Sequence, residues 1–128
     1  MRKYWGILPI LFMTNSFKFY DSGFINQNKK SISVKIFGVG MPILDMNIYK
    51  KSICLNGNCF KKDVFNNNYL SEFYPTEIMQ NIMSAQPIFN SQNLIQEKNN
   101  FSQNIFQEDK FDIVYRVDEK QIYFKDNK

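Results

Sequence analysis

The sequence contains no histidine, a single tryptophan and only two cysteines among its 128 residues. The absence of histidine excludes imidazole-based catalytic triads, zinc sites with His ligands and His acid–base pairs. Two thiols alone would leave the tetrahedral coordination of zinc half empty. We therefore expect no metal site and no cofactor.

Glycines and carboxylates also lack a catalytic arrangement. The Gly-Val-Gly stretch at 38–40 has neither the third glycine nor the following helix of a dinucleotide-binding fingerprint. The only adjacent carboxylates are at 108–109 and 118–119, and adjacent residues of a strand face opposite sides. No catalytic residue and no enzymatic activity are expected.

Hydrophobic residues make up 44% and aromatic residues 16% of the chain, which is not the composition of a disordered protein. The length suits a single domain, 1–128. Residues 1–64 carry ten basic and three acidic side chains, a net charge of +7, whereas residues 65–128 carry six and nine, a net charge of −3. The basic residues neither line one helix nor alternate with exposed aromatic residues, so nucleic acid is not an expected partner.

The N-terminal segment has two interpretations. Arg2 and Lys3 precede a short apolar run, 5–13, and Thr14 and Ser16 would then be the small residues before a cleavage site, as in a secretory signal. The run is too short to span a bilayer as a helix, which needs about 20 apolar residues. In the second interpretation, residues 6–12 and 17–20 are the first two strands of the domain.

Alternating apolar and polar residues predict a meander in the next part of the chain. Residues 31–37 and 43–49 each place apolar side chains on one face and polar side chains on the other. Residues 52–55 and 59–61 flank Asn56-Gly57, a strong hairpin signal because both central residues of a type I′ turn need positive φ. These four segments predict four consecutive antiparallel strands.

One helix is expected after the meander. Residues 63–73 are polar and Asn-rich and are predicted to form a loop, and so are residues 90–100. Pro75 suits the first position of a helix that ends before Pro87. Its apolar stripe consists of Ile78, Met79, Ile82 and Met83.

Three further strands are expected near the C-terminus, at 101–106, 111–117 and 121–124. Asp126-Asn127 is a turn signal that would precede one more strand.

The two cysteines face each other in the predicted hairpin. With Asn56-Gly57 as the turn, Cys54 and Cys59 form a non-hydrogen-bonded pair whose Cα atoms would be about 4.5 Å apart, within reach of a disulfide. An oxidising envelope compartment would favour this bond, whereas a cytosolic protein would keep both thiols reduced.

The loop between the first two strands of the meander is unusually apolar, with Val39 and Met41 at its tip. It is interpreted either as a finger that inserts into a membrane or a partner, or as a loop folded over the end of the core. Three lysine pairs, at 29–30, 50–51 and 61–62, should gather at the opposite end of these strands. The simplest interpretation of these lysines is a solubilising rim.

This order of elements resembles the LolB family of outer-membrane lipoproteins, which accept other lipoproteins from a periplasmic carrier and insert them into the membrane. The match covers residues 32–87: a strand, the turn at 37–40, the return strand, the Asn-Gly hairpin, and the helix that begins at Tyr74-Pro75 and ends at Gln86-Pro87. The chain departs from the family pattern in having one helix and no lipid-bearing cysteine, and Val39 stands where the family has a larger apolar residue.

The resemblance implies a mainly β fold, an antiparallel curved sheet or incomplete β-barrel with one helix on its concave face. It also implies binding of lipoprotein acyl chains in an apolar hollow and their delivery to the outer membrane by a monomer at its periplasmic face, with a periplasmic carrier protein and the inner leaflet as partners. In the family, the apolar residue of the turn inserts into the membrane, and here this residue is Val39. The residues expected to contact acyl chains are Ile32, Val34, Ile36, Leu44, Met46, Ile48, Ile78, Met79, Ile82, Met83, Phe111 and Ile113.

An alternative function is the binding of another protein instead of a lipid. About seven short strands also suit a non-catalytic β-sandwich module that binds another envelope protein through its edges. A cavity large enough for an acyl chain distinguishes the two functions, because a sandwich core is filled.

Overall fold

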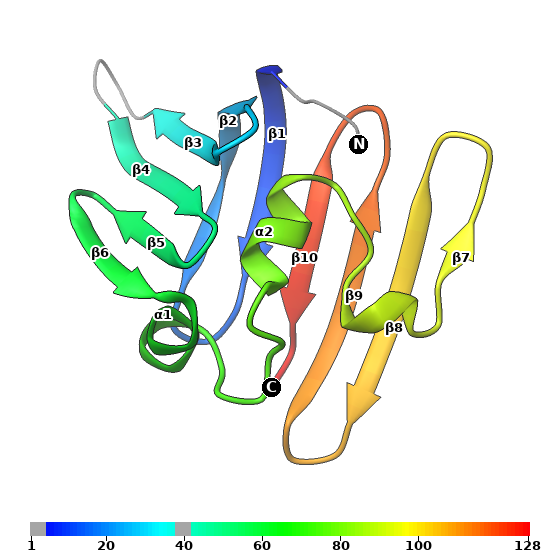
Figure 1. Ribbon diagram of the computed structural model, residues 1–128. Coiled ribbons are helices and arrows are strands. Elements are labelled where there is room, and N and C mark those ends of the chain that lie inside the picture. The colour runs from blue at the N-terminus through cyan, green and yellow to red at the C-terminus, as the bar shows by residue number, and fades with distance from the viewer. Residues whose placement is uncertain (1–4, 38–41) are drawn as a thin grey trace.

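The computed structural model describes residues 5–37 and 42–128, which contain ten strands and two α-helices (Figure 1). The elements are β1 (Trp5–Met13), β2 (Lys18–Gln27), β3 (Ser31–Phe37), β4 (Pro42–Tyr49), β5 (Ser52–Leu55), β6 (Asn58–Lys61), α1 (Lys62–Tyr69), α2 (Ile78–Met83), a 3₁₀ turn η1 (Phe89–Ser91), β7 (Ile95–Gln96), β8 (Phe101–Gln107), β9 (Phe111–Val117) and β10 (Ile122–Asp126).

All ten strands form one sheet in the order β6-β5-β4-β3-β2-β1-β10-β9-β8-β7. Neighbouring strands are antiparallel except β1 and β10, which run parallel with Ile10 opposite Ile122 and Phe12 opposite Phe124. The sheet is therefore mixed, with one parallel pair among otherwise antiparallel strands. The first and last strands of the chain meet in the middle of the sheet, and no local turn determines the direction of such a pair.

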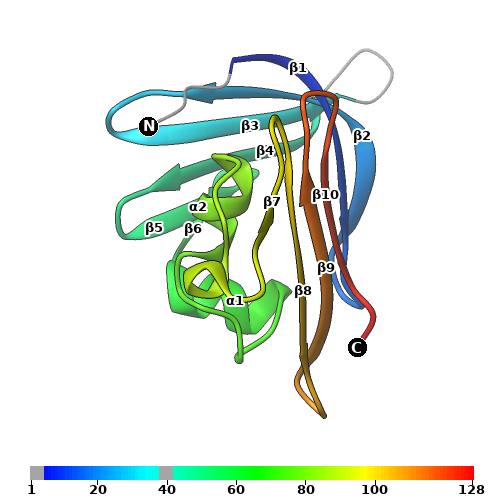
Figure 2. The same ribbon diagram turned by 90° about the vertical axis from the view of Figure 1, so that its right-hand side faces the viewer.

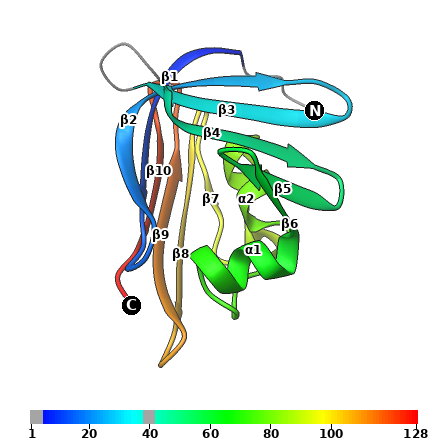
Figure 3. The ribbon, with the colours of Figure 1, turned by 90° about the vertical axis from the view of Figure 1, so that its left-hand side faces the viewer.

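The sheet is open and strongly curved. Figures 2 and 3 show that β3–β6 run across the direction of β8–β10, and that both helices lie in the angle between these two arms. Strands β6 and β7 are the two edges and do not pair with each other, so the sheet is not closed into a barrel. The expected mainly β, curved and incomplete barrel is confirmed, with two α-helices where the sequence predicted one.

The meander β3–β6 is confirmed, and its alternation builds one side of the core. The inward-facing residues of β3 and β4 lie opposite one another in the register: Ile32 with Ile48, Val34 with Met46, and Ile36 with Leu44. All six are buried. A shift of one residue would turn this whole set to the outside, so burial of the apolar face fixes the register.

The N-terminal segment forms the central strand β1. It pairs with β2 along its whole length and with β10 on its other side, and Ile10 and Phe12 have no exposed surface. Strand β2 extends beyond the expected 17–20 and pairs with β1 from Lys18 to Asn26. Gly23 leaves room for the Ile10 side chain, since a Cβ at Gly23 would lie 2.6 Å from Ile10 Cδ1. The N-terminal segment was interpreted either as a secretory signal or as the first strands of the domain, and in the structure it is a strand. Cleavage after Ser16 would remove this strand, which joins the two arms of the sheet.

Helix α1 occupies part of the segment predicted to be a loop, so that prediction is wrong. Asparagine disfavours helix interiors, but here tertiary packing dominates. Phe65 is fully buried, and its ring lies 5.0 Å from that of Tyr69, one helical turn later. Phe17 and Phe60 complete the aromatic cluster, with ring centroids 6.3 and 6.5 Å from that of Phe65.

Helix α2 lies on the concave face and packs against β3 and β10. It is shorter than the sequence indicated, but its four predicted apolar residues have no exposed surface. At its C-terminal end, the Ser84 hydroxyl donates to the carbonyl of Gln80 at 2.6 Å. The apolar periodicity therefore identified the buried face of this helix correctly.

A buried polar contact ties the segment before α2 to the last strand. The Tyr74 hydroxyl donates to Asp126 Oδ2, and Asp126 Oδ1 accepts the backbone N–H groups of Asp112 and Lys128. Burial raises the pKa of Tyr74 well above its usual value, and the hydrogen bond and negative charge of Asp126 raise it further. The neutral hydroxyl is thus the form that the folded state stabilises.

This raised pKa predicts alkaline destabilisation. In the unfolded chain Tyr74 ionises near its ordinary pKa of about 10, so its contribution is complete below that pH and is lost at about 1.4 kcal/mol per pH unit above it. Tyr74→Phe should remove this pH-dependent part of the stability. At neutral pH it should also lower the free energy of unfolding by about 1–2 kcal/mol, because Asp126 loses a hydrogen-bond donor. Urea unfolding of the wild type and the variant, below and above the ordinary pKa of tyrosine, measures both effects. An equal decline in wild type and variant would contradict the assignment.

Candidate ligand-binding site

The twelve residues expected to contact an acyl chain all belong to the hydrophobic core. They come from β3, β4, α2 and β9, and Phe111 and Ile113 of β9 are 5% and 1% exposed. The side chains of α2 occupy the concave face between the two arms of the sheet. In this structure the concave face is therefore largely filled.

A pocket of about 910 Å³ opens at one end of this face, and we call it the basic pocket. Its volume lies within the range of about 300–1,000 Å³ that is typical of small-molecule sites. It is lined by Gln27, Asn28, Lys29, Lys30, Ser31, Ile32, Ile48, Tyr49, Lys50, Lys51, Ser52, Glu77 and Gln80. The lining combines the β2–β3 turn, the β4–β5 turn and one side of α2.

The basic pocket has both apolar and charged walls. Ile32 and Ile48, two of the twelve expected contact residues, face each other in the β3–β4 register and are buried beneath it. Tyr49, which also lines the pocket, is 42% exposed. The four lysines of the two turns are exposed. The site can therefore offer apolar contact and positive charge to the same ligand.

Hydrogen bonds give the β2–β3 turn a defined shape. Asn28 Oδ1 accepts the backbone N–H groups of Lys30 and Ser31 at 2.8 and 3.0 Å, and the Asn28 N–H donates to the carbonyl of Ser31 at 3.0 Å. Asparagine is common in such turns because its side chain can satisfy nearby backbone donors. The lysines at 29 and 30 thus project from an ordered loop.

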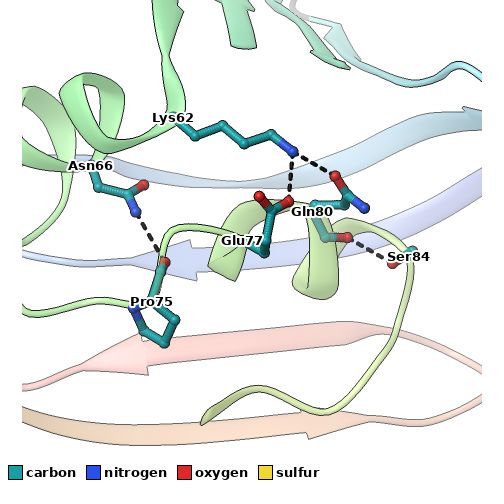
Figure 4. A network of polar contacts seen from close by, with 6 residues as sticks. All are labelled: Lys62, Asn66, Pro75, Glu77, Gln80 and Ser84. Carbon is teal, nitrogen blue, oxygen red and sulfur yellow. Dashed lines mark hydrogen bonds and ion pairs between the residues drawn. The ribbon is translucent and has the colours of Figure 1, made fainter. Parts of the chain in front are cut away.

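Lys62, the first residue of α1, links α1 to α2 (Figure 4). Its Nζ donates to Glu77 Oε1 and to Gln80 Oε1, both at 2.6 Å. The Lys62 side chain is 3% exposed and that of Glu77 is 47% exposed. Asn66 Nδ2 makes a second connection by donating to the Pro75 carbonyl at 3.0 Å. Since Glu77 and Gln80 line the basic pocket, α1 supports the wall that α2 contributes.

The lysine pairs gather at one end of the meander, as predicted. Those at 29–30 and 50–51 line the basic pocket, Lys61 pairs with the lining residue Ser52, and Lys62 contacts Glu77 and Gln80. What the sequence did not indicate is that the lysines at 29–30 and 50–51 line a pocket. The lysine doublets were the signal, but their spacing alone does not distinguish a solubilising rim from a binding site.

The proposed membrane-inserting residues, Val39 and Met41, lie outside the described residues. Their neighbours Phe37 and Pro42 end β3 and begin β4, at the opposite ends of these strands from Ser31 and Tyr49. The basic pocket and the loop at 38–41 are therefore joined to opposite ends of the same hairpin.

Cys54 and Cys59 form the predicted disulfide. They are opposite each other across the β5–β6 hairpin, with Cα atoms 3.9 Å apart, and Asn56 and Gly57 both have the positive φ that the turn requires. Cys59 is exposed and Cys54 half-buried, so the bond lies on the outer face of the sheet. It links the two outermost strands of this arm.

Within residues 5–37 and 42–128, no group of three or more His, Cys, Asp or Glu side chains is placed to hold a metal ion. Over the same residues, neither helix has the length and hydropathy needed to cross a membrane.

Comparisons with protein-family models, with curated proteins and with solved structures found no match to this chain.

Proposed function

We propose that this protein binds the acyl chain of a lipid or lipoprotein, without covalent chemistry, at the basic pocket and the concave face behind it. The observation that supports this proposal is the contact between the pocket and the core: Ile32 and Ile48 belong to both. A chain that enters the pocket would meet buried apolar side chains.

Helix α2 is the element that must yield to such a chain. It has only six residues, and two of them, Met79 and Met83, are fully buried; Met46 of β4 is a third fully buried methionine of the same core. Methionine side chains are flexible and repack easily around varied shapes. The driving force is sufficient, because each buried methylene contributes about 0.8 kcal/mol. Displacing α2 would extend the pocket along the concave face.

The wider role follows from the resemblance to the LolB family. That resemblance implied an open curved sheet with one helix on its concave face, and the structure has an open curved sheet with two α-helices beside that face (Figures 2 and 3). On this basis the ligand is an acylated lipoprotein, received from a periplasmic carrier and delivered by a monomer to the inner leaflet of the outer membrane. In this role Val39 is proposed to enter the membrane.

One observation favours the alternative, a module that binds another envelope protein. Strand β7 pairs only with Phe101 and Ser102 of β8, so among the described residues the rest of β8 has no strand beside it on that edge. Phe106, near the end of β8, is 64% exposed. An extended peptide could add to such an edge.

Displacement of the neutral fluorescent probe N-phenyl-1-naphthylamine by fatty acids tests the acyl-chain proposal. We expect the folded protein to enhance the fluorescence of the probe and palmitate to reverse this. From octanoate towards palmitate, affinity should rise about fourfold per added methylene until the site is full. A folded protein that binds neither probe nor palmitate would contradict the proposal.

A matched pair of variants locates the site. Ile48→Val removes one methyl group from the pocket and should weaken palmitate binding about two- to fourfold. Ile105→Val makes the same change in β8, where Ile105 is equally buried but lines none of the described pockets, and should leave affinity unchanged. Both should cost about 0.5–1.5 kcal/mol of stability, so neither is expected to unfold the protein.

A further inference from the structure

We propose that the basic pocket selects an anionic amphiphile, whose phosphate or carboxylate head contacts the lysines of the two turns while its chain lies over Ile32 and Ile48. This inference rests on the proposed function and adds the charge of the ligand head to it. It assigns to the lysines a binding role in place of a merely solubilising one.

The register of β3 and β4 brings the two lysine pairs together. Ser31, which directly follows Lys30, is opposite Tyr49, which directly precedes Lys50. The turns at 28–30 and 50–51 therefore lie side by side at the end of the same two strands, and both line the pocket. Lysines that are 20–22 residues apart in sequence thus form one cluster around one opening.

The cluster lacks neutralising carboxylates. In the described part of the chain the one ion pair within 4.0 Å is that of Lys62 with Glu77. Glu77 is also the only carboxylate in the pocket lining, so its charge is already balanced by a lysine outside that lining. Four positive side chains consequently surround a concave surface without a negative partner. An anion placed among them would relieve their mutual repulsion, an electrostatic gain that a neutral ligand cannot provide.

The polar and apolar parts of the lining are separated in the way an amphiphile requires. The lysines are exposed at the opening, whereas Ile32 and Ile48 are 5% and 1% exposed and belong to the core. Lysine presents a flexible point charge on a long stem and makes no fixed bidentate contact. The site should therefore recognise the charge of the head more than its shape, and the chain should supply most of the affinity.

Two lysophospholipids with the same palmitoyl chain distinguish the contribution of the head group to binding from that of the acyl chain. Lysophosphatidic acid carries an anionic phosphate, and lysophosphatidylcholine is zwitterionic. Below their micellar concentrations, and at low salt, we expect the anionic lipid to displace N-phenyl-1-naphthylamine from the wild-type protein about tenfold more effectively. The preference should shrink at high salt, because the lysines are exposed and screened. Palmitate provides the carboxylate head for comparison.

Paired substitutions assign the preference to the pocket. Lys29→Gln with Lys50→Gln takes one charge from each turn and should remove most of the preference while lysophosphatidylcholine binds as before. Lys18→Gln with Lys98→Gln changes the net charge equally at exposed lysines outside the described pockets and should leave the preference intact. Circular dichroism melting curves verify that all proteins are folded.

Each outcome has one meaning. Equal displacement by both lipids, or an equal effect of the two double variants, would overturn the head-group inference while the acyl-chain proposal stands. Failure of the probe and of every lipid to bind would overturn both. Selective binding of lysophosphatidic acid alone would support a phosphate head, and binding of palmitate as well would support any anionic head.

Discussion

Ile82→Glu is expected to lower the free energy of unfolding by about 3–5 kcal/mol. Ile82 has no exposed surface and lies on the side of α2 that packs into the core. The substitution removes apolar contacts and places a carboxylate where no charged partner is described. Urea denaturation followed by circular dichroism measures the change.

The control makes the same substitution on the surface. Ile95 of β7 is 58% exposed, and Ile95→Glu should change stability by no more than about 0.5 kcal/mol. If the two variants were equally stable, α2 would not be a core element of the folded protein, and the proposed displacement of α2 by a ligand would lose its basis.

Glu77→Ala is expected to cost about 2 kcal/mol, more than removal of the lysine with which Glu77 pairs. The reason is the difference in burial: Lys62 is 3% exposed, so without Glu77 its ammonium group keeps only Gln80 as a described partner. Lys62→Met removes the charge and preserves the apolar stem, so it should change stability by less than about 1 kcal/mol. Glu77 is half-exposed and can be solvated when Lys62 is absent.

Urea unfolding of the two single variants and of the double variant gives the coupling between Lys62 and Glu77. Glu72→Ala provides the control, since Glu72 is exposed and forms no described ion pair, and it should be nearly neutral. A larger loss from Lys62→Met than from Glu77→Ala would show that packing of the lysine stem, and not its charge, holds α1 and α2 together.

Local patterns predicted the parts of the fold that burial alone determines. The alternation in β3 and β4 and the apolar stripe of α2 each identify a face that must be removed from water, so the register and the core residues follow. The Asn56-Gly57 turn likewise fixes which residue faces which across the β5–β6 hairpin, and so determines the position of the disulfide.

Non-local contacts determined what the sequence did not predict. Helix α1 depends on Phe65 packing against Phe17 and Phe60, which come from other elements, although the spacing of Phe65 and Tyr69 was a usable helical signal. Strand β7 has two exposed residues and no apolar pattern of its own. The parallel pairing of β1 with β10 joins segments more than 100 residues apart.

In the candidate site, too, local patterns predicted some features and non-local contacts determined the others. Its apolar residues were predicted from alternation, and the gathering of the lysines followed from the meander. The pocket itself depends on where α2 docks, and the Lys62–Glu77 contact spans 15 residues and joins α1 to the N-cap residue of α2. Neither can be derived from the pattern within one element.

Calorimetric titration of the delipidated, folded protein with palmitate tests the central claim most directly. We expect saturable binding at a single site with a negative heat-capacity change, which marks the burial of apolar surface. Absence of saturable binding, while the protein remains folded, would contradict the claim that the basic pocket and the concave face behind it receive an acyl chain.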